Sequence, residues 1–265
     1  MSATGQDDDG HGRGLGNLLS GLAVAVGCLL FLGGFAWGAV EYKPYTVPTE
    51  SMNPTVKAGD RVLAQRIDGA DVKRGDVVIF KDKVWGNATM VKRVVGIGGD
   101  TVKCCDQGGK LTVNGKTVEE PYLHDVAPST SKFSATVPKD QLFLLGDQRN
   151  VSLDSRVHLE DAANGSVPRS AVSARVDAIA WPLDGMLKRP DGFKEFPGGI
   201  SQPGPLRLMV GAVIAGAVLI FGGGVYGPVA GFLGRRRRGR ADRAGGGGTG
   251  TGTGAGGREV SVGGQ

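Results

Sequence analysis

Two long uncharged blocks constrain this 265-residue chain more than any other feature of its sequence. Residues 15–40 and residues 208–233 contain no Asp, Glu, Lys or Arg, and each block is 26 residues long. An α-helix needs about 20 predominantly apolar residues to cross the roughly 30 Å hydrocarbon core of a bilayer. The sequence therefore predicts two transmembrane helices, at residues 15–40 and 206–233.

A cleaved secretory signal peptide is the alternative explanation of the first block, because such a peptide is also apolar and N-terminal. Its apolar core is only about 7 to 15 residues long and follows a positively charged region. The segment before the first block instead carries Asp7, Asp8 and Asp9. A helix that the protein retains explains the block better.

The net charge of +5 is concentrated at the C-terminus. After Gly234, seven arginines stand against Asp242 and Glu259, which gives 7 − 2 = +5 and leaves the rest of the chain neutral overall. Nucleic acid binding would need basic residues on a folded face, so this charge does not indicate it, and we expect no nucleic acid partner. By the positive-inside rule, the segment RRRRGRADR beside the second block marks the cytoplasmic side. We therefore expect both termini in the cytoplasm and the middle of the chain outside.

These observations divide the chain into five segments. Residues 1–14 are expected to be a cytoplasmic polar tail, and residues 15–40 the first transmembrane helix. Residues 41–205 would form an extracytoplasmic domain, followed by the second helix at 206–233. Residues 234–265 are so rich in glycine and arginine that they are expected to be a disordered cytoplasmic tail.

The extracytoplasmic segment is expected to be mainly β. Short apolar runs bounded by Gly, Pro or Asp occur at residues 76–80, 90–97, 141–145 and 174–181, and none is long enough for a typical helix. The segment KLTVNGKTV, residues 110–118, predicts a hairpin, because Asn114-Gly115 suits the left-handed positions of a two-residue turn. The sequence thus predicts an antiparallel β-sheet domain anchored by a transmembrane helix at each end.

Cysteine and histidine residues do not indicate a metal site. Cys28 lies in the first uncharged block, and the three histidines of the chain have no zinc-binding spacing. Cys104 and Cys105 are neighbours, so they can either close a small ring or pair with another molecule. We expect neither a metal nor a cofactor.

Ser51 and Lys92 are the candidates for a nucleophile and its general base. Ser51 lies in the segment SMNPT, 11 residues after the first block ends at Val40. A serine that attacks a carbonyl needs a base within hydrogen-bond reach and donors for the oxyanion. Strand alternation in TMVKRVVGI, residues 89–97, places Lys92 and Arg93 on opposite faces. Of the two, only the lysine can lose its proton when buried.

Histidine is the more familiar partner of a catalytic serine. Only His124 and His158 lie between the two uncharged blocks, and His158 stands in the charged segment DSRVHLED. A histidine in such a solvated segment is a poor candidate for the base, so the Ser/Lys variant of the triad is favoured.

The segment LLGDQRNVSLDSRV, residues 144–157, is the third that carries polar chemistry. It follows a predicted strand and holds alternating acidic and arginine residues with serines between them. Charges this close usually form either a structural network of ion pairs or a solvated turn.

These segments, in this order and behind an N-terminal helix, resemble bacterial type I signal peptidase, the membrane-bound Ser/Lys-dyad serine endopeptidase that removes signal peptides from exported proteins. The family pattern S-M-x-P-T corresponds to residues 51–55, and R-G-D followed by apolar residues to 74–78. The lysine pattern corresponds to residues 92–100, with Gly98 in place of the usual proline. The pattern G-D-N-R-x-x-S-x-D-S-R corresponds to residues 146–156, with Gln148 in place of asparagine.

The resemblance implies a role for each matching residue. Ser51 would be the nucleophile, and Lys92 the general base and later the general acid. Ser152 would orient the lysine amine by a hydrogen bond. The backbone N–H of Ser51 and the hydroxyl of Thr49 would form the oxyanion hole.

The resemblance also implies supporting and substrate-binding residues. Structural ion pairs would hold the loop against the catalytic strand, and they would be formed by Asp147, Arg149, Asp154 and Arg156. Shallow pockets for small substrate side chains, usually alanine, would be walled by Val47, Met52 and Val91. The implied partners are signal peptides of secreted preproteins, the lipid bilayer of the bacterial plasma membrane and, as a candidate, the secretion translocon.

Two other functions fit part of the sequence. One is a self-cleaving or regulatory Ser/Lys protease of related fold, a class whose members are soluble and bind DNA. Two transmembrane helices and a neutral middle segment disfavour it. The other is a catalytically inactive membrane-anchored β domain that binds exported peptides or cell-wall components, and in such a domain Ser51 and Lys92 would be dispensable.

Overall fold

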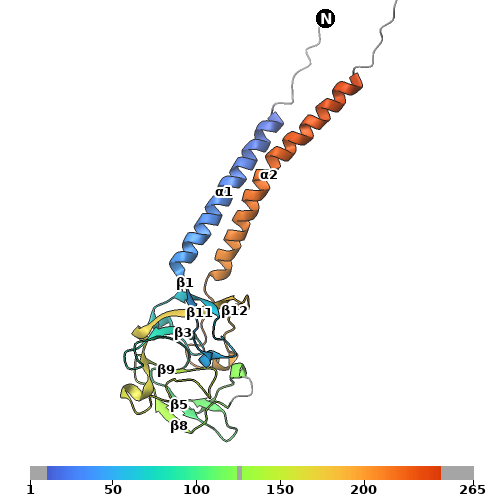
Figure 1. Ribbon diagram of the computed structural model, residues 1–265. Coiled ribbons are helices and arrows are strands. Elements are labelled where there is room, and N and C mark those ends of the chain that lie inside the picture. The colour runs from blue at the N-terminus through green and yellow to red at the C-terminus, as the bar shows by residue number, and fades with distance from the viewer. Residues whose placement is uncertain (1–10, 124–126, 246–265) are drawn as a thin grey trace, which may run out of the picture. The chain divides into compact units, whose positions relative to one another are not determined.

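The computed structural model describes residues 11–123 and 127–245 of the chain (Figure 1). The chain divides into two compact units. One comprises residues 32–213, and the other comprises residues 1–31 together with 214–265. The first of these holds both β-sheets, and the second holds most of the two long helices.

The two long helices are α1 (His11–Glu41) and α2 (Leu206–Gly245). Within them, residues 18–41 and 206–226 are long and apolar enough to cross a membrane, as predicted. The helices pack closely where glycines face the neighbouring backbone. Ser20 Oγ donates a hydrogen bond of 2.7 Å to the carbonyl of Gly223, and a β-carbon on Gly27 would lie only 2.9 Å from the carbonyl oxygen of Gly216. Small residues allow such close approach between membrane helices.

The ends of the helices differ from the predicted bounds. Helix α2 continues to Gly245, although the sequence predicted a disordered tail from residue 234 onward. Arginine is a good helix former, so the arginine-rich segment can extend an existing helix. Helix α1 begins at His11, within the predicted polar tail. Residues 1–10 and 246–265 lie outside the described residues.

Residues 32–213 form two antiparallel sheets (Figure 1). The larger has eight strands in the order β1-β2-β11-β3-β4-β9-β10, with β12 paired to β11, and the smaller has the order β7-β6-β5-β8. The strands of the larger sheet are β1 (Tyr42–Thr46), β2 (Arg61–Arg66), β3 (Val77–Lys81), β4 (Thr89–Ile97), β9 (Gln141–Leu145), β10 (Val167–Pro168), β11 (Val172–Trp181) and β12 (Gly185–Met186). Those of the smaller sheet are β5 (Thr101–Cys104), β6 (Leu111–Val113), β7 (Lys116–Thr117) and β8 (Phe133–Thr136). The described part of the chain also contains short 3-10 helices before, between and after these strands: η1 (Glu50–Met52), η2 (Gly69–Asp71), η3 (Pro121–Leu123), η4 (Ala162–Gly165), η5 (Arg169–Ala171) and η6 (Asp191–Phe193).

The mainly antiparallel β fold confirms the prediction. Strands β3, β4, β9 and β11 occupy the four apolar runs identified in the sequence. Strands β6 and β7 form the predicted hairpin, with positive φ angles of 54° at Asn114 and 77° at Gly115. A two-residue turn needs these left-handed conformations to match the twist of its strands.

Strand β4 lies where the three hydrophobic clusters of the domain meet. Val91 belongs to the cluster around Met52, Val94 to a second cluster and Val95 to a third. The strand is also paired on both sides, with β3 and with β9. Side chains on a strand packed in this way have little freedom to move. Strand β4 is therefore a rigid support for Lys92.

Two further contacts consolidate the domain. Arg74, which begins the R-G-D pattern, and Asp100, which ends the lysine pattern, form a buried ion pair through two contacts of 2.6 and 2.7 Å. Cys104 and Cys105, whose pairing the sequence left open, are joined to each other in a disulfide.

Candidate active site

Ser51 and Lys92 are in direct contact. Ser51 lies in η1, the short helix that follows β1, and Lys92 lies in the middle of β4. The distance between Lys92 Nζ and Ser51 Oγ is 2.7 Å. Both residues are buried, with 7% of Ser51 and 5% of Lys92 exposed. The two residues are 41 positions apart, so only the folding of η1 against β4 brings them together.

Burial lowers the pKa of the Lys92 ammonium from 10.5 to about 8. The main cause is the loss of water around the charge, and the negative charges of Asp154 and Asp147 oppose it. A buried ammonium that keeps little solvation releases its proton more easily. The site therefore contains an amine that is partly neutral near physiological pH and touches a serine hydroxyl.

A cavity of about 350 Å³ opens beside the two residues. Its lining comes from the end of β1 through η1, from β3, from the start of β4 with the residue before it, and from the loop after β9: Tyr45, Thr46, Val47, Pro48, Thr49, Glu50, Ser51, Ile79, Ala88, Thr89, Met90, Val91, Lys92, Val151 and Leu153. Apart from Ser51 and Lys92 the walls are largely apolar. An extended peptide fits a cavity of this kind better than a highly charged ligand does.

The three residues expected to wall substrate pockets occupy different positions. Val47 and Val91 line the cavity. Met52 does not line it, because its side chain is completely buried in the hydrophobic cluster of the larger sheet. Thr49 also lines the cavity, and its Oγ1 lies 3.2 Å from Ser51 Oγ.

Ser152 lies close to the nucleophile but makes no hydrogen bond to Lys92. Its side chain is buried, and among the described residues its Oγ has no hydrogen-bond partner. A β-carbon placed on Gly146 would lie 2.1 Å from Ser152 Oγ and 2.4 Å from the carbonyl oxygen of Ser51. The loop after β9 therefore approaches the nucleophile so closely that position 146 has no room for a side chain.

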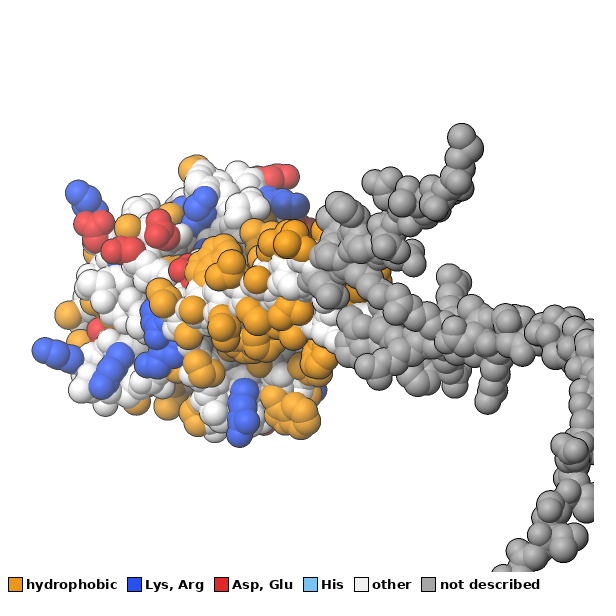
Figure 2. All heavy atoms as spheres, turned by 90° about the horizontal axis from the view of Figure 1, so that it is seen from above, with side chains coloured by type: hydrophobic (Ala, Val, Ile, Leu, Met, Phe, Trp, Pro, Cys, Tyr) orange, Lys and Arg blue, Asp and Glu red, His pale blue; other side chains and the backbone are white. Residues whose placement is uncertain are grey.

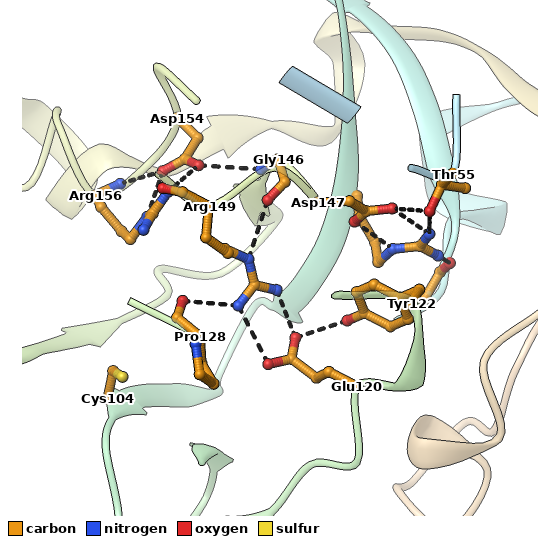
Figure 3. A network of polar contacts seen from close by, with 12 residues as sticks. Thr55, Cys104, Glu120, Tyr122, Pro128, Gly146, Asp147, Arg149, Asp154 and Arg156 are labelled. Atoms are coloured by element: carbon orange, nitrogen blue, oxygen red, sulfur yellow. Dashed lines mark hydrogen bonds and ion pairs between the residues drawn. The ribbon is translucent and has the colours of Figure 1, made fainter. Parts of the chain in front are cut away.

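The charged residues of the loop after β9 form ion pairs, but some of their partners differ from those that the sequence predicts. Asp147 pairs with Arg93 through contacts of 2.6 and 2.8 Å. It also accepts a hydrogen bond from Thr55 (Figure 3). Asp154 pairs with Arg156 at 2.7 Å. Arg149 does not pair with Asp147.

The partner of Arg149 is Glu120, which sequence reasoning did not identify. Its Oε1 lies 2.5 Å from Arg149 Nη2. Glu120 stands in the segment TVEEPYL, where nothing distinguishes it from its neighbour Glu119. The sequence likewise excludes Arg93 as a general base but does not predict its ion pair with Asp147. The only sequence feature that points to this pairing is the position of Arg93 next to Lys92, which directs its side chain to the opposite face of the strand.

The histidines lie away from this chemistry. The ring of His158 stacks on Trp85 with centroids 4.6 Å apart, and its Nδ1 lies 2.7 Å from Asp161 Oδ2. His124 lies outside the described residues. In the part of the chain that the structure describes, no three His, Cys, Asp or Glu side chains cluster as metal ligands would.

Comparisons with known proteins identify the family of this chain. Residues 18–181 match the family model described as "Signal peptidase, peptidase S26", which covers more than half of the chain and all of the residues described above. The chain belongs to the signal peptidase family. It is therefore a peptidase, and its helices are those of a membrane-anchored enzyme.

Several relatives of the peptidase are about a third identical to it over the regions that align. Signal peptidase IB of Staphylococcus aureus (strain Mu50 / ATCC 700699) is 33% identical over 181 residues, which are 61% of this chain and 87% of that protein. A probable signal peptidase I of Mycobacterium leprae (strain TN) is 31% identical over 199 residues, 53% of this chain and 68% of that one. Signal peptidase I U of Bacillus subtilis (strain 168) is 36% identical over 127 residues, 44% of this chain and 66% of that one.

A solved structure of a signal peptidase I from Enterococcus faecalis V583 is 27% identical and covers 44% of this chain and 97% of its own, with a TM-score of 0.32. The TM-score is too low for this likeness to say anything about the fold.

Proposed function

We propose that this chain removes N-terminal signal peptides from exported preproteins as a Ser/Lys-dyad endopeptidase, with Ser51 as nucleophile and Lys92 as general base. The observation that carries the proposal is the 2.7 Å contact between two buried groups, Lys92 Nζ and Ser51 Oγ. Membership of the signal peptidase family supports the substrate class. An inactive β domain that only binds peptides would not need this contact.

The proton moves in two directions during the reaction. Neutral Lys92 takes the hydroxyl proton of Ser51 while Oγ attacks the scissile carbonyl, and the resulting ammonium then gives a proton to the leaving amine of the mature protein. Water hydrolyses the acyl-enzyme by the same route. With a pKa of about 8, roughly one lysine in ten is neutral at pH 7, whereas at 10.5 only about one in 3,000 would be.

Thr49 and the backbone of Ser51 supply the oxyanion hole in this mechanism. The hydroxyl of Thr49 lies 3.2 Å from the attacking oxygen and lines the same cavity. Ser152 is the orienting group. Its buried hydroxyl has no other partner among the described residues, so it is free to accept a hydrogen bond from the ammonium that forms on Lys92. Donors aimed at developing charge are among the strongest contributors to acyl-transfer catalysis.

Specificity for small side chains is proposed to come from the apolar wall of the cavity. Val47 and Val91 line it beside the nucleophile, and we leave the buried Met52 out of the pocket. A substrate in extended form would lie along the cavity between the end of β1 and the start of β4. Backbone hydrogen bonds would then hold the peptide while small pockets select its side chains.

The membrane placement follows from the helices and the basic segment after the second one. Long apolar side chains remain exposed along both helices, among them Leu29, Leu32 and Phe221. Figure 2 shows hydrophobic side chains gathered on the face of the molecule seen from above. We propose that residues 15–40 and 206–233 span the plasma membrane, with residues 1–14 and 234–265 in the cytoplasm and residues 41–205 outside. The bilayer and the secretion translocon are then its proposed partners.

Separate variants Ser51→Ala and Lys92→Ala test the proposal. Membranes that contain the full chain would be mixed with an exported preprotein, and the products identified by mass spectrometry. Wild type should cut after a small residue, and both variants should lose cleavage. Ser131→Ala and Lys132→Ala, at exposed positions of the same domain, are matched controls that should cut normally. Normal cleavage by a folded Ser51→Ala or Lys92→Ala variant would refute the dyad.

A further inference from the structure

We propose that Glu120 is a positioning residue of the peptidase reaction, acting through Arg149 on the loop after β9, which contacts Ser51. The inference rests on the proposed function, because its effect is measured on the cleavage that Ser51 is proposed to perform. Glu120 lies outside every sequence pattern described above and contacts neither Ser51 nor Lys92 through any hydrogen bond.

Glu120 is held in one orientation by its own contacts. Only 3% of its side chain is exposed. Its two carboxylate oxygens face the Arg149 guanidinium at 2.5 and 3.2 Å, and the hydroxyl of Tyr122 donates a hydrogen bond of 2.7 Å to Oε1 (Figure 3). Two-point pairing of this kind fixes the plane of an arginine as well as its position. Glu120 therefore determines where the Arg149 guanidinium lies.

Arg149 passes this constraint to the loop after β9. Its Nε donates to the carbonyl of Gly146 at 3.0 Å, and its Nη1 donates to the carbonyl of Pro128 at 2.8 Å. The carbonyl of Arg149 itself accepts a hydrogen bond of 2.8 Å from Arg156. The Arg149 guanidinium thus links the segment that carries Glu120 to the loop after β9 (Figure 3).

The same loop touches the nucleophile. The backbone N–H of Gln148 donates a hydrogen bond of 3.1 Å to the carbonyl oxygen of Ser51, and Ser152 N–H donates to the Gln148 carbonyl at 3.1 Å. Gly146 approaches the Ser51 carbonyl as closely as described above. A shift of Arg149 would therefore move atoms in direct contact with Ser51 and with its proposed orienting residue. A displacement of about 1 Å at a reacting group can lower the rate roughly 100-fold.

Charge makes Glu120 hard to replace. Two guanidiniums, those of Arg93 and Arg149, are buried in this network, and the Arg93 guanidinium lies 4.0 Å from the centre of the Tyr122 ring. Asp147 neutralises the first of them and Glu120 the second. A buried cation without its partner seeks another carboxylate or solvent. Loss of Glu120 would therefore release Arg149 from Gly146 rather than leave it in place.

The matched pair Glu120→Gln and Glu119→Gln tests the inference in the full-length protein in detergent. Glu119 is the adjacent residue, with 67% of its side chain exposed and a surface pair with Lys110. We expect Glu120→Gln to lower kcat about 10- to 100-fold per folded molecule, with KM within about twofold. Glu119→Gln should keep the wild-type values. A purely structural role would reduce the folded fraction and leave kcat per folded molecule unchanged.

A milder variant keeps the test decisive if Glu120→Gln does not fold. Tyr122→Phe removes the hydrogen bond to Glu120 and retains the ring against Arg93, and we expect it to lower kcat by roughly threefold. The inference is overturned if a folded Glu120→Gln matches Glu119→Gln, or if Tyr122→Phe matches wild type when Glu120→Gln cannot be measured. Failure of wild type to cleave, or cleavage by Ser51→Ala, would instead refute the proposed function.

Discussion

The pH dependence of cleavage should report the unusual pKa of Lys92. Only the neutral amine accepts the Ser51 proton, so kcat/KM should rise with pH. With a pKa of about 8, the neutral fraction grows from about 1% at pH 6 to about 90% at pH 9 and then levels off. A lysine left at 10.5 would give a rate that still rises about tenfold per unit at pH 9.

The bend in the profile is therefore the decisive observation. It can be measured as kcat/KM of the purified full chain on a signal-peptide substrate between pH 6 and 10.5, because kcat/KM reflects groups of the free enzyme. We expect the bend near pH 8. Lys92→Arg should be inactive at every pH, since a guanidinium keeps its proton. A flat profile between pH 6 and 9, or a rise without a bend beyond pH 10, would contradict a buried lysine base.

Three further predictions concern stability and packing. The pKa of Lys92 is lower in the folded than in the unfolded chain, so the unfolded chain binds more protons between pH 8 and 10.5. The free energy of unfolding, measured with urea, should therefore rise by about 3 kcal/mol across this window. Lys92→Met should remove the rise. Asp147→Asn leaves Arg93 buried without its ion pair and should cost about 3 to 5 kcal/mol by chemical denaturation, whereas Glu195→Gln on the surface should change nothing measurable. Gly146→Ala should abolish cleavage even where circular dichroism shows a folded domain, because its β-carbon would lie 2.4 Å from the carbonyl oxygen of the nucleophile, and normal cleavage would show that the loop can retreat.

Local patterns predicted the secondary-structure elements, but they predicted few of the tertiary contacts. Alternation along residues 89–97 correctly assigned Lys92 and Arg93 to different environments, one in the cavity and the other against Asp147. The pairing of Arg93 with Asp147 spans 54 positions, and that of Arg149 with Glu120 spans 29. Local sequence patterns cannot predict pairings between residues so far apart in the chain. Because the chain has many acidic residues, the partner of each arginine depends on which loops the fold brings next to it.

Hydropathy and alternation determined by themselves that this chain has two membrane-length helices around a β domain, since both properties depend on neighbours within a few residues. Only the tertiary structure decided that the amine of Lys92 is stripped of water, that Met52 belongs to the core and that Glu120 rather than Glu119 neutralises Arg149. Desolvation and ion pairing arise from atoms that are distant in sequence and meet only when the sheets close around them.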